Sequence, residues 1–241
     1  MSKSIERKRY IMLRLMTHNV WNRDDNAPAW EAKGENCAAS VRVGSLIRMW
    51  KELSPDIIGC QEVSRLMAEL LKENLEKEGI NYALIWGRFT PILYRPEKFE
   101  LVDTEFLTYP EEIEGYEGEF NDVKSKAVNV AVFREKASGK VFIFATTHLW
   151  WKTDPKNVVE YGFPEPYTLM AGSDAAREYQ IKLADELIEK YRRIHNCPVI
   201  FVGDMNTAYN TAAIQYALSN GYRHAHDIAT DYREESVGYH N

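Results

Sequence analysis

Cysteine is scarce in this sequence, and its three copies, Cys37, Cys60 and Cys197, are scattered over 241 residues. No two of them are separated by two residues, so their spacing does not predict a zinc knuckle. An odd number of dispersed cysteines does not predict a disulfide framework either. A reducing compartment is the simplest interpretation, and we therefore expect a cytoplasmic protein.

Long apolar runs and runs of basic residues are also missing. The N-terminus, MSKSIERKRYIMLRLM, is basic, but Arg14 interrupts its short apolar stretch, which makes it a poor signal peptide. No run approaches the length of a membrane span, and nothing indicates an obligate protein partner. The formal net charge of -6 argues against binding duplex nucleic acid through a broad basic surface. A local phosphate site stays compatible with this charge, because a bound divalent cation supplies positive charge.

What is present is an alternation of strand-like and helix-like runs. Hydrophobic residues make up 45% of the chain, enough for a sizeable core, and we expect one domain over residues 1–241. Runs rich in β-branched and aromatic residues predict strands, and runs with apolar residues at helical spacing predict helices. The expected strands are 11–20, 56–61, 82–86, 91–95, 126–133, 140–148 and 197–204, and the expected helices are 37–53, 64–79, 173–193 and 210–221.

The stretch from Ala131 to Phe144 predicts a hairpin, because two strand-like runs are joined through a short segment that ends at Gly139. An antiparallel pair does not fit a purely parallel, doubly wound sheet. We therefore expect an α/β sandwich of two sheets with helices on the outside. Residues 111–122, which are acidic, and residues 150–173, which contain three prolines, predict loops.

Polar side chains follow four of the expected strands, at the point where each strand ends. These endings deliver Asn19, Glu62, His148 and the pair Asp204 and Asn206. One such ending is ordinary, because strands end in turns and Asp and Asn are turn residues. Four of them favour a shared active-site rim.

The order and spelling of these endings resemble the endonuclease/exonuclease/phosphatase superfamily, which has the fold of deoxyribonuclease I. The matching pieces are THNVWN, DIIGCQEV, PILYRPEKFEL, TTHLWW and FVGDMNT, which together span residues 17–207. Each piece alone is a weak signal, whereas all five in order are a strong one. The resemblance implies a four-layer α/β sandwich, in which two mixed β-sheets pack face to face between outer helices. It also implies hydrolysis of a phosphate ester that depends on Mg²⁺, with Mn²⁺ as a possible substitute.

The resemblance assigns a role to each strand-end residue. Glu62 would bind the metal, with Asn19 as a second candidate ligand, since Mg²⁺ prefers one or two carboxylates together with water and substrate phosphate. Asp204 would position and deprotonate the attacking water, while Asn206 and Asn19 would orient water, metal-bound oxygen or Asp204. His148, in its protonated form, would stabilise the charge that develops on phosphorus. The alternative for each is structural: a helix-terminal acid, a packed histidine or a turn amide.

Three further residues are candidates for substrate binding. Arg177, at the start of an expected helix, would reach a phosphate oxygen, although a salt-bridged surface position explains it equally simply. Trp150 and Trp151 follow His148 directly, and neighbours on an extended segment point in opposite directions. We expect one of them in the core and one at the mouth of the site, where it would stack on a base or sugar. Core packing of both is the alternative.

The sequence departs from the superfamily at its end. The superfamily closes with strands that bring an Asp and a His into the site, and this sequence ends at ESVGYHN, before either is expected. We therefore expect the last strands to be missing and the activity of residues 1–241 to be weak, because such groups act as a unit. His240 is a minor candidate for replacing the absent histidine.

Three functions compete on this sequence. The first is a phosphodiesterase or phosphatase, for which the acidic net charge favours a small or single-stranded substrate over duplex DNA. The second is a nuclease or deadenylase that acts on single-stranded nucleic acid. The third is a non-catalytic binding module that kept the fold, which the intact set of Glu62, His148 and Asp204 opposes.

Overall fold

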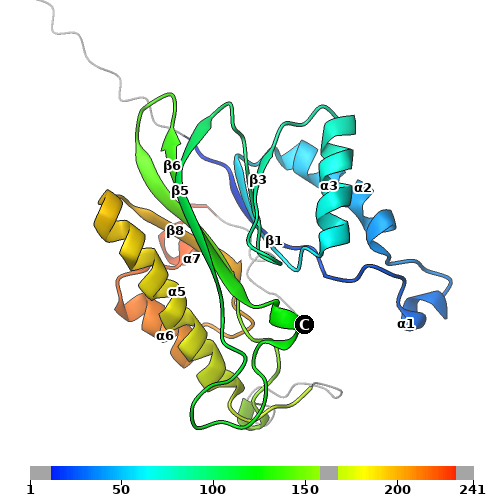
Figure 1. The fold of residues 1–241 in the computed structure, drawn as a ribbon, viewed down its shortest axis with the longest axis vertical. Coiled ribbons are helices and arrows are strands. Elements are labelled where there is room, and N and C mark those ends of the chain that lie inside the picture. The colour runs from blue at the N-terminus through cyan, green and yellow to red at the C-terminus, as the bar shows by residue number, and fades with distance from the viewer. Residues whose placement is uncertain (1–11, 158–167, 232–241) are drawn as a thin grey trace, which may run out of the picture.

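The computed structural model describes residues 12–157 and 168–231, which form two four-stranded mixed β-sheets (Figure 1). In the first sheet the strand order is β1 (Leu15–Asn19), β2 (Ile57–Gln61), β4 (Ile92–Tyr94) and β3 (Ala83–Ile85). In the second it is β5 (Phe99–Thr108), β6 (Ala127–Glu135), β7 (Val141–His148) and β8 (Val199–Asp204). Each sheet contains one parallel pair, β1 with β2 and β7 with β8, and its other neighbours are antiparallel.

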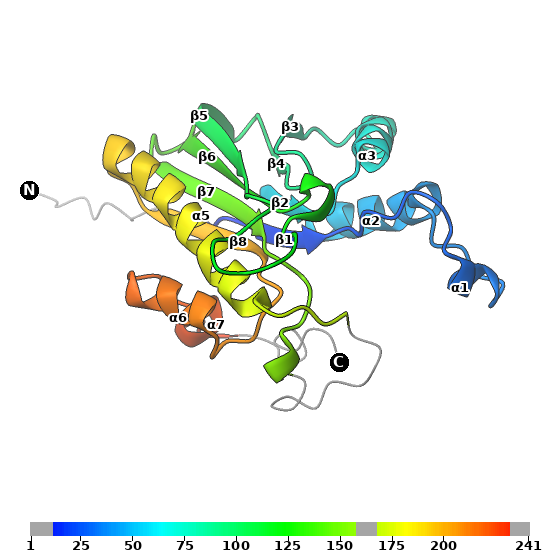
Figure 2. The same ribbon diagram turned by 60° about the horizontal axis from the view of Figure 1, so that its bottom comes forward.

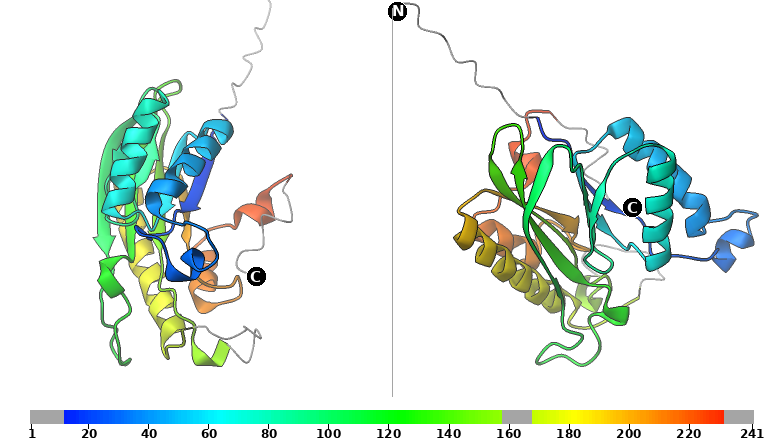
Figure 3. Two further views of the ribbon diagram at one scale, coloured as in Figure 1. Left: turned by 90° about the vertical axis from the view of Figure 1, so that its right-hand side faces the viewer. Right: turned by 45° about the horizontal axis from the view of Figure 1, so that its top comes forward.

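Helices cover the outer face of each sheet, which gives the expected four layers. Helices α2 (Ala39–Leu53) and α3 (Arg65–Lys77) pack on the first sheet, and α5 (Ser173–His195) and α6 (Ala212–Ser219) pack on the second. Figure 3 shows the two helix pairs, blue and cyan against yellow and orange, on opposite sides of the sheets. The remaining helical segments are short: α1 (Pro28–Glu31), a 3₁₀ turn (Asp122–Lys124) and α7 (Ala225–Ile228). None of the described helices combines the length and the apolar character needed to cross a membrane.

The helices next to the first sheet begin and end where the sequence signals indicate. In α2 the apolar residues Val43, Ile47 and Trp50 recur at helical spacing, and all three are buried. The side chain of Ser64 accepts a hydrogen bond from the backbone N–H of Met67, so it caps the first turn of α3. These local signals fix the helices over the strands that deliver the polar residues.

The hairpin predicted from residues 131–144 is present as β6 and β7, and its register pairs Ala131 with Phe144. Strand β5 was not predicted. Its sequence, FELVDTEFLT, mixes apolar residues with charged and polar ones, and Phe99 is its only buried residue. A search for apolar runs overlooks such a strand, because charged residues interrupt it.

A polar network crosses the interface between the sheets just below the strand ends. The buried side chain of Gln61 donates hydrogen bonds to the hydroxyl of Thr17 (3.1 Å), to the carbonyl of Gly59 (3.0 Å) and, across the interface, to Thr146 Oγ1 (2.8 Å). The sheets approach each other closely here, since a Cβ atom on Gly59 would lie 2.8 Å from side-chain atoms of Thr146 and Val202. The network holds the end of β2 in register with β7.

Replacement of Gly59 with Ala is expected to destabilise the protein by roughly 1–3 kcal/mol, because the added methyl group overpacks this contact. Urea unfolding measures the change. Gly44→Ala is the matched control: Gly44 lies in α2, and a Cβ atom there meets no heavy atom within 4 Å. That change should stabilise the protein by about 0.5–1 kcal/mol. Equal effects at the two positions would contradict the close approach of the sheets at Gly59.

Candidate active site

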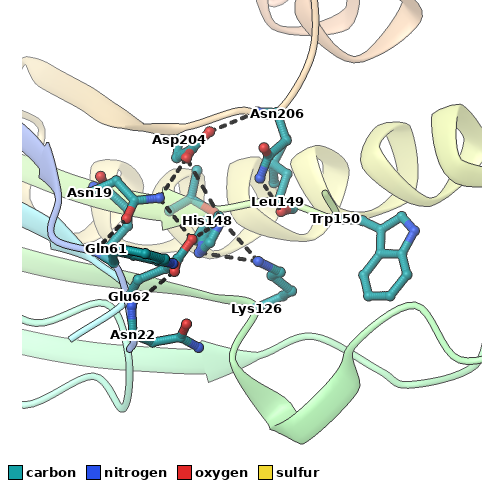
Figure 4. Close-up of polar contacts among 12 residues, drawn as sticks. Asn19, Asn22, Gln61, Glu62, Lys126, His148, Leu149, Trp150, Asp204 and Asn206 are labelled. Carbon is teal, nitrogen blue, oxygen red and sulfur yellow. Dashed lines mark hydrogen bonds and ion pairs between the residues drawn. The ribbon is translucent and has the colours of Figure 1, made fainter. Parts of the chain in front are cut away.

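The two parallel strand pairs place four polar endings at one edge of the sandwich. Parallel neighbours end on the same side, and the register pairs Asn19 with Gln61 in the first sheet and His148 with Asp204 in the second. Because the sheets pack face to face, these two ends meet. The structure therefore brings together four of the expected residues, Asn19, Glu62, His148 and Asp204 (Figure 4).

The side-chain amide of Asn19 joins the two sheets. Its nitrogen, Nδ2, donates hydrogen bonds to Glu62 Oε1 at 2.9 Å and to Asp204 Oδ2 at 2.8 Å. Its oxygen, Oδ1, accepts a hydrogen bond from the backbone N–H of Trp21 at 2.9 Å. Two carboxylates from different sheets thus converge on one amide nitrogen, which fixes the distance between them.

Glu62 is the first residue after β2, and its backbone has a φ of 59°, in the left-handed region that a glutamate seldom adopts. Its second oxygen, Oε2, accepts a hydrogen bond from the backbone N–H of Asn22 at 3.0 Å. Backbone strain of this kind costs on the order of 1–3 kcal/mol and is concentrated at functional sites. The strained turn aims the carboxylate across the sheet interface instead of along the strand.

Asp204 ends β8, and Asn206 supports it. The backbone N–H of Asn206 donates a hydrogen bond to Asp204 Oδ1 at 3.1 Å, and the Asn206 side chain donates one to the carbonyl of Leu149 at 3.0 Å. Asn206 also has a left-handed backbone, with a φ of 48°. Its side chain bonds Leu149, the residue that follows β7, and its backbone bonds Asp204 at the end of β8. Asn206 therefore holds the ends of these two strands together.

His148 is buried, and its closest charged neighbour is Lys126, whose Nζ lies 2.9 Å from His148 Nε2. The carboxylates are slightly further away, at 3.8 Å for Glu62 and 3.9 Å for Asp204. Burial and the charge of Lys126 together hold the pKa of His148 well below its ordinary value of 6.5. The direction of this shift opposes the protonated histidine expected from the sequence and favours a neutral His148 next to the cationic Lys126.

Lys126 is itself buried, and burial lowers its pKa from 10.5 to about 8, against the opposing effect of Glu62, Asp204 and Asp122. The sequence reasoning missed this residue because it considered only the carboxyl ends of strands. A signal was available: the hairpin register pairs Ala127 with His148, and Lys126 is the residue just before that pair. In an antiparallel pair, the start of one strand lies beside the end of its neighbour.

Arg177 does not join the carboxylates as expected. It is buried in the first turns of α5, and its guanidinium donates hydrogen bonds to the carbonyls of Trp150 (3.1 Å) and Lys152 (2.7 Å) and forms an ion pair with Asp174. Those contacts anchor the segment that follows β7. Arg177 therefore has a structural role in this fold. It does not make the expected hydrogen bond to a phosphate oxygen, because two nitrogens of its guanidinium already bond groups inside the protein.

The two tryptophans after His148 differ in exposure, although their ring centroids lie only 6.1 Å apart. Trp150 is fully buried against Phe120, and Figure 4 shows its ring turned away from the cluster. A substrate cannot reach it, so its expected contact with substrate is wrong. Trp151 is 43% exposed, with its indole N–H donating a hydrogen bond to Asp122 at 3.3 Å, and it remains available for stacking.

Within residues 12–157 and 168–231, no group of three or more His, Cys, Asp and Glu side chains is arranged to hold a metal ion. Mg²⁺ does not need such a group, because it binds through one or two carboxylates and keeps water and phosphate as its other ligands. Glu62 and Asp204 supply two carboxylates side by side, with 20% and 12% of their side chains exposed. This donor set fits a hard divalent cation. The expected substitute histidine, His240, lies outside the described residues.

Comparison with known proteins gives one family. The model of the family described as "Endonuclease/Exonuclease/phosphatase family" matches residues 16–240. No curated protein sequence matches the chain.

Three solved structures illustrate the similarity of the fold. The mannosyl-6-phosphatase of Bacteroides thetaiotaomicron is 21% identical, with a TM-score of 0.59 over 87% of this chain and 71% of that chain. The catalytic domain of human Nocturnin with bound sulfate anion is 16% identical, with a TM-score of 0.58 over 85% and 68%. TDP2 of D. rerio, complexed with a single-strand DNA product, is 16% identical, with a TM-score of 0.53 over 81% and 61%.

Proposed function

The chain belongs to the endonuclease/exonuclease/phosphatase family, and from this premise we propose that it hydrolyses a phosphate ester with the help of a divalent metal. One observation carries the proposal: carboxylates from both sheets, Glu62 and Asp204, meet at Asn19 beside a buried Lys126 and His148. Negative groups that can hold a cation and a positive group that can face a phosphate thus lie within one cluster.

In the proposed mechanism the carboxylate of Glu62 would hold Mg²⁺ or Mn²⁺. Asn19, the second expected ligand, would instead orient Glu62 and Asp204, because its amide nitrogen faces both carboxylates. When bound, the metal supplies positive charge that polarises the phosphate and offsets the charge of the transition state. Asp204 accepts the proton of the attacking water through its carboxylate, which Asn206 and Asn19 hold in orientation.

On the other side of the cluster, Lys126 and His148 face the reacting phosphate. His148 donates a ring N–H to a phosphate oxygen, and Lys126 stabilises the negative charge that increases in the transition state. Both groups are buried, so water screens their interaction with phosphate only weakly. Charges fixed in this way need little reorganisation during the reaction.

Two classes of substrate are compatible with these groups, and the neighbours in fold represent both. One neighbour is named as a sugar phosphatase, and another holds a single-strand DNA product. The exposed Trp151, beside the strand that carries His148, favours a substrate with a ring that can stack, which keeps a nuclease or deadenylase as the second candidate.

Hydrolysis of a panel of phosphate esters tests the proposal. We expect purified residues 1–241 to hydrolyse at least one of mannose 6-phosphate, bis-p-nitrophenyl phosphate or a single-stranded oligonucleotide when Mg²⁺ or Mn²⁺ is added. EDTA should abolish the reaction and excess Mg²⁺ should restore it. The protein is used in excess over the substrate, so that slow hydrolysis is also detected. If EDTA leaves the rate of hydrolysis unchanged, the proposed metal dependence is wrong. If no ester is hydrolysed, the proposed hydrolase is wrong and a binding module becomes the better interpretation.

A further inference from the structure

The segment between β1 and α2, residues 20–38, carries two large aromatic side chains that the proposed chemistry does not use. Trp21 is 39% exposed and Trp30 is 42% exposed, and their ring centroids lie 6.2 Å apart with an interplanar angle of 49°. Trp30 lies in α1, which has no buried residue and, as Figure 2 shows, projects away from the sheets. Exposed aromatic side chains gathered in this way are characteristic of contact surfaces.

This segment is held by many hydrogen bonds, although Val20 and Cys37 are its only buried residues. Arg42 of α2 donates hydrogen bonds from its guanidinium to four carbonyl groups along it, those of Val20, Trp21, Arg23 and Cys37. The side chain of Asn26 closes the segment, bonding the carbonyl of Glu35 at 3.0 Å and the N–H of Cys37 at 2.9 Å. The tryptophans are therefore presented on a fixed support.

Trp21 is tied directly to the catalytic cluster. Its backbone N–H bonds Asn19 Oδ1 at 2.9 Å, and the next residue, Asn22, bonds Glu62 Oε2 at 3.0 Å. Trp21 also adopts a left-handed backbone, with a φ of 61°, which is unfavourable for a bulky residue and is kept only when the surroundings impose it. The backbone of Trp21 is thus positioned by the same hydrogen bonds that position Asn19 and Glu62.

Arg42 reinforces this arrangement from behind, with its guanidinium carbon 5.3 Å from the centre of the Trp21 ring. Burial lowers the pKa of Arg42, and the charges of Asp24 and Glu62 oppose this effect, so Arg42 lies within electrostatic range of the cluster. The Trp21 ring therefore has both Arg42 and Trp30 as neighbours, on the side of the site formed by the first sheet.

The chemistry around the two tryptophans indicates what they bind. The polar side chains that support them are engaged by the backbone: Arg42 and Asn26 as described, and Arg23 by the carbonyls of Asp25 (3.1 Å) and Asn26 (3.2 Å). A sugar on an aromatic face needs polar side chains beside it for its hydroxyl groups. A flat, unsaturated ring needs only the aromatic face, and stacking on a base is worth about 1–3 kcal/mol.

We propose that Trp21 and Trp30 form a stacking subsite for the nucleobase of the substrate, so that the substrate class of this site is a nucleotide-containing phosphate ester. This inference rests on the proposed function, because it assumes that the phosphate of the same molecule occupies the neighbouring cluster. The phosphate is held by charge, and the base is selected by contact with the two indole rings.

Binding of 5′-AMP and of ribose 5-phosphate, which differ only in the base, tests the subsite. Calorimetric titration with Ca²⁺ in place of Mg²⁺ measures both dissociation constants while the phosphate site keeps a divalent cation. We expect the parent protein to bind 5′-AMP roughly 5- to 150-fold more tightly than ribose 5-phosphate, the ratio that corresponds to one stacked base. Trp21→Ala and Trp30→Ala should each bring this ratio close to one, whereas Trp30→Phe, which keeps an aromatic ring, should retain most of it.

Trp151→Ala tests the competing stacking residue, because Trp151 is an exposed tryptophan that follows β7 of the second sheet. If Trp151→Ala removed the preference for 5′-AMP while Trp21→Ala kept it, the base would stack elsewhere and the inference would be overturned. Because α1 buries no residue, Trp30→Ala should fold normally, and far-ultraviolet circular dichroism checks this.

Hydrolysis assays separate failure of the subsite from failure of the proposed function. An equal affinity for both ligands, together with metal-dependent hydrolysis of esters, would overturn the subsite and leave the function standing. A preference for 5′-AMP that depends on Trp21, in a protein that hydrolyses no ester, would support the subsite and reject the hydrolase.

Discussion

Replacing Asp204 with Asn is expected to lower kcat for phosphate-ester hydrolysis by about 10²- to 10⁴-fold, the usual contribution of a general base. The amide has the same shape as the carboxylate and can still accept the hydrogen bond from Asn19 at its oxygen. It cannot accept a proton from water at neutral pH. The fold should be nearly unaffected, because the loss is confined to one hydrogen bond, worth about 1 kcal/mol.

Single-turnover kinetics and urea unfolding measure the two effects on the same protein. Asp103→Asn is the control, since Asp103 is an aspartate on β5 with 44% of its side chain exposed, and it should leave kcat unchanged. A variant of Asp204 that keeps more than a tenth of the parent activity would show that another group receives the proton. A large loss of stability would instead show that the effect on activity comes from the fold.

The architecture was largely predictable because it depends on local patterns. The hairpin, the capped helices and the alternation of strands with helices are written in short stretches of sequence, such as the cap at Ser64. Strand β5 was missed because charged residues, including Glu100 and Asp103, interrupt its apolar residues, and only its pairing with β6 reveals it as a strand. The pairing of strands that are distant in sequence cannot be predicted from local sequence patterns alone.

The site was predictable to the extent that parallel strands end together. That rule identified Asn19, Glu62, His148 and Asp204, which the structure brings within contact distance of one another. The rule did not predict which of Trp150 and Trp151 enters the core. The sequence pattern indicates only that one of two neighbours is buried, and the packing of the fold decides which one.

Charge was the least predictable property of the site. The protonation of His148 depends on its burial and on Lys126, which lies 22 residues earlier in the chain. Arg177 was misassigned for a related reason: a sequence does not show that backbone carbonyls already engage the guanidinium. Both errors concern desolvated groups whose partners come from distant segments.

Lys126 gives the second large prediction. Lys126→Met should lower kcat by roughly 10²- to 10³-fold, because it removes the positive charge that faces the phosphate. The same change should stabilise the folded protein at pH 7.5 by roughly 3 kcal/mol, because a charged lysine with a pKa near 8 is less favourable in the fold than in the unfolded chain. A residue that costs stability and supports activity is characteristic of a functional site.

The dependence on pH follows from the direction of the shift. The pKa of Lys126 is about 8 in the fold and 10.5 in the unfolded chain, so the unfolded state binds more protons between these values. The stability of the parent should therefore rise with pH across this window, and Lys126→Met should lack that increase. Urea unfolding of both proteins at pH 7.5 and 9.5 measures it, and the difference between them cancels the contribution of the tyrosines.

Lys124→Met is the control for this experiment, because the Lys124 side chain is 56% exposed and pairs with Glu111 at 3.2 Å. An exposed ion pair contributes at most about 1 kcal/mol, so neither stability nor kcat should change greatly. If Lys126→Met behaved like Lys124→Met, Lys126 would not be a desolvated cation next to His148. If it gained stability without losing activity, Lys126 would be buried but unused. Only the combination of higher stability, a flatter pH profile and lower kcat identifies a lysine whose charge is kept in the core to meet a phosphate.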